Sequence, residues 1–204
     1  MKGLLLKDFY MARKYFKSYI LLSVIFLGSA MVSDNLFFLF YPCLLCSMIP
    51  VNLLAYDERG KWDVYTGTLP LSRAQIVSAK YLMGLITQSF VFACVGLTQL
   101  VRMQRNGAFD LAEYGTILGM LLSLCCITVA IPMPFMFKLG VEKGRMAYYV
   151  MVGVACGGSY LASSLVSEVN SVDLPVPILC FAAIGFYGLS WFLSIRLYEK
   201  KEIT

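Results

Sequence analysis

The chain has 204 residues and a formal net charge of +5; 59% of its residues are hydrophobic and 14% are charged, against roughly 45–50% and about 25% in a typical soluble protein. A soluble fold of this length could not bury so much apolar surface, so the composition indicates a protein that crosses a membrane several times. The sequence has no histidine, which excludes Ser-His-Asp hydrolysis and His-ligated zinc chemistry. In a membrane protein the positive charge indicates topology and not binding to nucleic acid.

The N-terminal segment, residues 1–17, has the pattern of an amphipathic helix. Leu5, Phe9, Ala12 and Phe16 recur at helical spacing and would form one apolar face, while most of the lysines fall on another face. We expect this helix to lie in the membrane plane, at the level of the cytoplasmic headgroups. The alternative is a basic flank that only sets the orientation of the chain.

Apolar segments long enough to cross a bilayer make up most of the remaining sequence. A spanning helix needs about 20 mostly apolar residues. We therefore expect an all-α polytopic membrane protein with one permease-like domain, residues 1–204, and six transmembrane helices: residues 16–33, 36–56, 74–101, 114–137, 146–166 and 175–196.

The basic residues are distributed unevenly about these spans. Of the 17 Lys and Arg residues, only Arg102 and Arg105 fall on the side opposite to the N-terminus. The positive-inside rule then places both termini in the cytoplasm.

The segment between the second and third spans, residues 57–73, has the highest density of charge. Its first half surrounds a tryptophan with charges of both signs, which suits docking on a protein better than binding to lipid: Asp57, Glu58, Arg59, Lys61, Trp62 and Asp63. Ser72 and Gln75 then predict a capping box, so the third span has a rigid start. A charged segment joined to a rigid helix can transmit force, although an ordinary solvated loop with a good cap is an equal alternative.

Polar residues inside the spans are the candidates for a translocation pathway. These are Asn52, Thr87, Gln88 and Gln99, and the spacing of Gln88 and Gln99 puts them on nearly the same face of one helix. The alternative for each is a helix–helix hydrogen bond, with a strength of about 0.6–2 kcal/mol. The seven cysteines all fall in apolar runs, and we interpret them as packing residues and not as metal ligands.

Two parts of the charged segment, together with a lysine that follows it, resemble a known family. Glu58-Arg59-Gly60, then Leu-Pro-Leu-Ser-Arg at residues 69–73, then Lys80, are similar to the first cytoplasmic loop of ABC exporter permeases of the type-2 superfamily. The start MKGLLLKDFY resembles the opening of the same family. The specific motif covers about residues 56–83, whereas the six expected spans resemble the family over the whole chain.

The resemblance implies a permease subunit of a bacterial exporter in the cytoplasmic membrane, with residues 1–17 as its connecting helix. Residues 57–73 would carry the coupling helix that docks on a separate ATPase subunit, and a second permease subunit, identical or related, would complete the transporter. The chain contains no G-x-x-x-x-G-K-[ST] motif, so we expect no cofactor and no enzyme activity here, with ATP and Mg on the partner.

The substrate is the least defined feature. The small size and the lack of an outer domain resemble bacterial permeases grouped with exporters of peptides, including amphipathic ones. The short segment at residues 167–174 departs from many relatives, which carry a longer insertion there, so we expect a minimal outer gate and the substrate stays open. Whether the transporter is a homodimer or a heterodimer stays open. The alternative is a six-span substrate-capture or regulatory membrane protein without an export pathway of its own.

Overall fold

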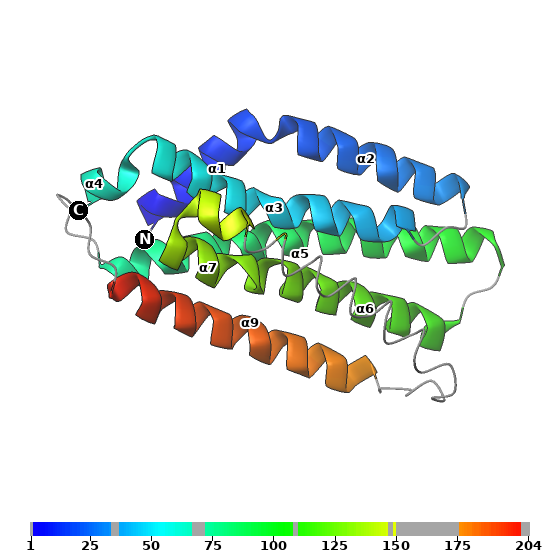
Figure 1. Ribbon diagram of the computed structural model, residues 1–204. Helices are drawn as coiled ribbons and strands as arrows, with labels where there is room; N and C mark the ends of the chain where they lie inside the picture. Colours follow the sequence, from blue (N-terminus) through cyan, green and yellow to red (C-terminus); the bar gives the residue numbers. More distant parts are fainter. Residues whose placement is uncertain are drawn as a thin grey trace.

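The computed structural model describes residues 2–33, 37–66, 72–107, 110–146, 149 and 176–200. All regular secondary structure in these residues is helical, which confirms the all-α fold. The helices are α1 (Lys2–Tyr15), α2 (Lys17–Val32), α3 (Phe37–Arg59), α4 (Trp62–Thr66), α5 (Arg73–Arg105), α6 (Leu111–Ala130), α7 (Pro132–Leu139) and α9 (Val176–Glu199). The long helices run side by side in one bundle (Figure 1).

Four helical segments are long and apolar enough to cross a membrane: α3, α5, α6 continued by α7, and α9. They agree with the second, third, fourth and sixth predicted spans to within a few residues. The first predicted span corresponds to α2, whose 16 residues reach the required length only together with α1. Nearly all of the fifth predicted span, residues 146–166, lies outside the described residues, so the count of six stays a prediction.

Helices α1 and α2 form a bent pair. Their axes differ by 67° across Phe16, whose side chain is buried at 3% exposure in the core. The bend turns α1 back over α3 and α5, so that charged residues of α1 reach both helices. This geometry brings together the site described below.

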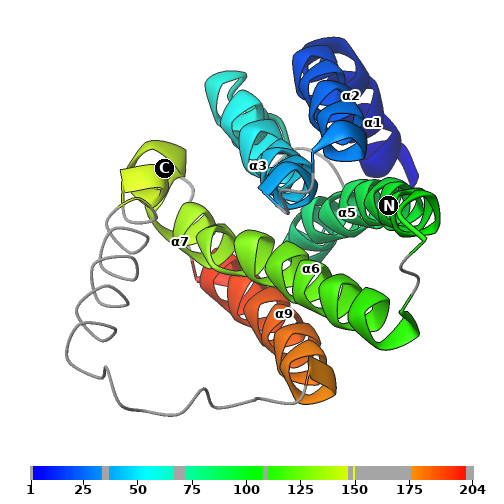
Figure 2. The same ribbon diagram turned by 90° about the vertical axis from the view of Figure 1, so that its right-hand side faces the viewer.

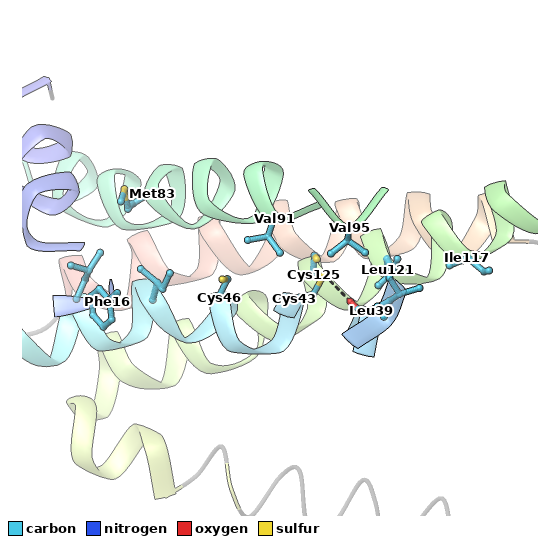
Figure 3. Close-up of a cluster of buried hydrophobic side chains, with 13 residues drawn as sticks. Phe16, Leu39, Cys43, Cys46, Met83, Val91, Val95, Ile117, Leu121 and Cys125 are labelled. Atoms are coloured by element: carbon cyan, nitrogen blue, oxygen red, sulfur yellow. Dashed lines mark hydrogen bonds between the residues drawn. The ribbon is translucent and has the colours of Figure 1, made fainter. Parts of the chain in front are cut away.

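Two buried clusters hold the bundle together. In the first, side chains of α3 pack against α5 and α6, and Cys43, Cys46 and Cys125 pack among aliphatic residues with free thiols (Figure 3). The second cluster joins the N-terminal part of α5 and the C-terminal part of α9 to α6 and α7. The face of α9 turned away from the other helices is apolar and exposed, with Phe181 at 77% and Leu189 at 70%.

Proline has different effects in two helices. Pro42 and Pro50 lie inside α3, which continues through both of them. At Ile131-Pro132, by contrast, α6 ends and α7 begins, because proline cannot donate the backbone hydrogen bond that would continue the first helix. Beyond this break α7 continues the same span and packs beside α3.

Candidate functional site

One end of the bundle collects most of the charged side chains of the described residues. Here α3 ends, α5 begins beside α1, and α9 finishes beside α7 (Figure 1). We call this region the inner end. Figure 2 views the bundle from the opposite, outer end, with α1 and α2 beside α3 and α5.

Four charged side chains from three helices form a buried ion-pair cluster at the inner end. Lys80 Nζ of α5 lies 2.7 Å from Asp8 Oδ1 of α1 and 2.6 Å from Asp57 Oδ2 of α3. Lys7 Nζ donates a hydrogen bond to Asp57 Oδ1 at 2.7 Å. The side chains of Lys80, Asp8 and Asp57 are only 2%, 1% and 4% exposed.

The two positive and two negative groups of this cluster compensate one another. Removal of any one group would leave an unpaired charge in the interior, which is strongly unfavourable. The cluster therefore fixes the position of α1 relative to α3 and α5. Lys7 also extends it to α4, because its ammonium group lies 4.0 Å from the centre of the Trp62 ring.

Glu58, the residue after Asp57, points in another direction. Its Oε2 accepts a hydrogen bond from the backbone N–H of Val141 at 2.7 Å, where the helical residues 141–146 begin. Gly140 permits this approach, because its φ is +84° and a Cβ there would lie 3.0 Å from Glu58 Oε1. Glu58 thus connects the end of α3 to the segment that follows α7.

The start of α5 contains the predicted capping box and a second contact beside it. Ser72 Oγ accepts the N–H of Gln75 at 3.3 Å, and Gln75 Oε1 accepts the N–H of Ser72 at 3.3 Å. The next residue, Arg73, donates to the backbone carbonyl oxygen of Glu199 at 2.7 Å. Ser72 therefore accepts a backbone N–H in the first turn of α5, and the adjacent Arg73 donates to a backbone carbonyl oxygen in the last turn of α9.

A polar network then joins α5 to α9 along the inner half of the bundle. Tyr81 Oη lies 2.8 Å from Ser190 Oγ and 2.7 Å from Ser194 Oγ. The Tyr81 ring stacks on Trp191 with centroids 5.6 Å apart, and Trp191 Nε1 donates to Ser78 Oγ at 3.1 Å. These contacts make α5 and α9 one rigid unit at this depth.

Of the residues that the sequence suggests for docking, some have contacts within the chain and others project outward. Asp57 is buried, the exposed Glu58 uses its carboxylate to accept the N–H of Val141, and Trp62 is half-buried beneath Lys7. Arg59 and Lys61 project outward, and Lys61 adopts a left-handed φ of 50° in the turn between α3 and α4. We call residues 59–61 the inner turn. The side chain of Asp63 and residues 67–71 lie outside the described residues.

The polar residues suggested for a pathway do not share a cavity in the described part of the chain. Asn52 donates to Tyr19 Oη at 3.2 Å and accepts from Arg145, in a polar cavity of about 200 Å³ at the inner end. Thr87 donates within its own helix to the carbonyl oxygens of Met83 and Gly84. The pathway role of these residues therefore remains a prediction.

Gln88 and Gln99 do lie on the buried side of α5, as their spacing indicates. Gln88 Nε2 donates to the carbonyl oxygen of Cys43 at 3.3 Å, which joins α5 to α3. Gln99 is 1% exposed. The Oε1 atoms of both glutamines are buried without a hydrogen-bond donor among the described residues.

The sequence did not reveal the ion-pair cluster. Lys80 stands out in the sequence only as part of the motif, and Asp8 has no predicted role. The available signal was weak: both residues interrupt mainly apolar helix faces, where an unpaired charge would be unfavourable. Within the described ranges, no group of three His, Cys, Asp or Glu side chains could hold a metal ion.

One comparison with known proteins matches nearly the entire chain. A family model with the description "ABC-2 family transporter protein" matches residues 3–199. No curated protein and no solved structure matches the chain. The matched range includes all of the contacts described above.

Proposed function

Because the chain belongs to the ABC-2 transporter family, we propose that it is the permease subunit of an ATP-driven exporter, with ATP hydrolysed by a separate subunit. In this proposal the inner turn is the docking point for the ATPase, which binds ATP and Mg. The permease provides no catalytic group. Its role is to convert movement of the docked ATPase into movement of its own helices.

The observation that carries this proposal is the connection of the inner turn to three helices. The turn begins directly after Asp57 and Glu58 and ends at Trp62. Asp57 connects it to α5 through Lys80, and Lys7 connects it to α1 through both Asp57 and Trp62. A displacement of the exposed turn would therefore be transmitted to buried contacts, and not absorbed by a flexible loop.

The rest of the inner end would distribute this displacement. Tyr81 and Arg73 join α5 to the inner half of α9, so the two helices would tilt together. Glu58 would transmit the same displacement to the segment after α7. The ATPase cycle would thus tilt α5 and α9 together from the inner end, and open the permease to the outer side.

The arrangement in the membrane is also part of the proposal. We assign six spans, both termini to the cytoplasm of a bacterial cell, and α1 to the membrane surface as a connecting helix. The 67° bend at Phe16 supports this assignment, as does the exposure of Phe9 beside the exposed cations Arg13 and Lys14. A second permease subunit would complete the transporter.

We propose an apolar or amphipathic substrate, such as a peptide. The cavity between α5, α6 and α9, lined by Gln88, Cys125 and Tyr187, has mainly apolar walls, and this supports such a substrate over a highly charged one. Asn52, Thr87, Gln88 and Gln99 would contribute the few polar contacts of the route.

The proposal is tested by mild solubilisation of the protein from its native membrane, with and without a non-hydrolysable ATP analogue. We expect a soluble subunit with a G-x-x-x-x-G-K-[ST] motif to co-purify in a fixed ratio, and vesicles containing both chains to hydrolyse ATP. A chain that purifies only with itself would contradict the proposal and favour a regulatory protein. A tightly retained small molecule together with a membrane scaffold subunit would favour a substrate-capture protein.

A further inference from the structure

An apolar groove of about 370 Å³ lies between α1, α2, α3 and α5. It starts beside Phe9 and Arg13 of α1 and extends along the bundle to Leu27 of α2 and Cys94 of α5. Figure 2 shows α1 and α2 beside α5 on this side of the bundle. The groove therefore runs from the depth of α1 toward the middle of the long helices.

The walls of the groove suit a hydrocarbon chain. Its open edge is formed by exposed apolar side chains, including Val24 at 61% and Phe90 at 69% exposure. The two hydroxyl groups in the walls already donate within their own helices, Ser23 to the carbonyl oxygen of Tyr19 at 2.8 Å and Thr87 to that of Met83 at 3.0 Å. Neither hydroxyl needs water or a polar ligand as an acceptor for its proton.

One charged residue, Arg13, lines the groove, and it lies at the end formed by α1. Its side chain is exposed, and the neighbouring cations Lys14 and Lys17 are exposed as well. A guanidinium group binds a phosphate through two parallel hydrogen bonds. An apolar channel with cations at one end is therefore complementary to an anionic amphiphile, with its phosphate at Arg13 and its chain along α5.

We propose that this groove binds one anionic phospholipid of the inner leaflet as a resident ligand. Arg13 contacts the phosphate, and one acyl chain occupies the space between α2 and α5. The lipid would reinforce the bend at Phe16, because it contacts both helices of the bent pair. This inference concerns a structural ligand and depends neither on the exported substrate nor on an ATPase.

The test is native mass spectrometry of the purified protein with phosphatidylglycerol or phosphatidylcholine carrying identical acyl chains. We expect one phosphatidylglycerol per chain, bound at least tenfold more tightly than phosphatidylcholine. Arg13→Gln should reduce this difference to about twofold or less. Arg105→Gln removes an exposed cation at the other end of α5 and should leave the preference unchanged.

A second pair of variants locates the acyl chain. Val24→Trp places a bulky side chain in the groove, whereas Leu21→Trp makes a similar change at an exposed position of α2 outside it. We expect Val24→Trp to weaken phosphatidylglycerol binding several-fold and Leu21→Trp to leave it unchanged, with equal melting temperatures for both variants. Equal binding of the two lipids, or phosphatidylglycerol binding that is unchanged in Val24→Trp, would overturn the proposal. It would also be overturned by a dimer that excludes lipid and dissociates in Val24→Trp, since a second copy would then occupy the groove.

Discussion

Lys80 and Asp57 form a buried ion pair of 2.6 Å that holds together the two ends of the charged segment between α3 and α5. Asp57 stands in the last turn of α3, and Lys80 lies two turns into α5. The exposed inner turn follows Asp57, and the ion pair joins α3 to α5 next to this turn. A segment of this construction can transmit a displacement, whereas a loop without such a contact would bend.

Loss of the Lys80 ammonium group should destabilise the inner end. Lys80→Met leaves Asp8 and Asp57 close together without the cation between them, so we expect a loss of about 3–5 kcal/mol in the free energy of unfolding. Denaturant unfolding in mild detergent measures this change.

The double variant Lys80→Met/Asp57→Asn is the matched control. It leaves Lys7 beside Asp8, a pair at 3.5 Å, and restores the charge balance of the cluster. Much of the stability should therefore return. If the double variant were as unstable as Lys80→Met alone, the loss would come from packing and not from unpaired charge.

Glu58 should hold the segment after α7 by accepting the N–H of Val141. Glu58→Ala removes the acceptor and should lower the free energy of opening of this segment by roughly 1 kcal/mol. Amide exchange should then be about fivefold faster. Amide hydrogen exchange at Val141 measures the effect. Glu58→Gln keeps an oxygen acceptor and should stay near the original rate, so equal exchange in the two variants would contradict this role.

Much of the fold could be predicted because its signals are local. Four long apolar segments become helices, and Ser72 with Gln75 forms a capping box because both partners lie within one turn. The ion-pair cluster depends on side chains far apart in the sequence, and it exists because the chain bends at Phe16. Hydrophobic periodicity identified the apolar face that contains Phe9, but it could not show that Asp8 is buried.

The same distinction explains why the docking residues divide. Asp57, Glu58 and Arg59 follow one another and look equivalent in the sequence. In the structure Asp57 turns inward to Lys80, Glu58 turns to Val141, and Arg59 remains exposed. Their different roles depend on which neighbour lies in each direction, and the sequence of the segment does not contain that information.

Tyr81 should determine how firmly α5 is attached to α9. Tyr81→Phe keeps the aromatic stacking on Trp191 but removes the hydroxyl between Ser190 and Ser194. We expect a loss of about 1–2 kcal/mol, seen as a lower melting temperature. Tyr41→Phe, on α3 outside this network, serves as the matched control and should melt like the unchanged protein. A Tyr81→Phe variant with an unchanged melting temperature would show that stacking alone joins the helices.

The capping box should keep the start of α5 rigid. Ser72→Ala removes the side-chain acceptor and should destabilise the first turn by about 1 kcal/mol, whereas Ser72→Asp retains an acceptor at the same position. Hydrogen exchange at Gln75 should be several-fold faster in Ser72→Ala and nearly unchanged in Ser72→Asp. Equally fast exchange in both variants would contradict the capping role.

The central claim is that a soluble ATPase docks on the inner turn, and it is tested most directly by the affinity of the purified ATPase for charge-reversed permeases. Arg59→Glu and Lys61→Glu change exposed cations without touching the ion-pair cluster, and Arg105→Glu makes the same change at the outer end of α5. We expect each inner-turn variant to weaken binding at least tenfold with an unchanged melting temperature, and Arg105→Glu to bind like the original protein. Equal affinity for all of these proteins would contradict the account.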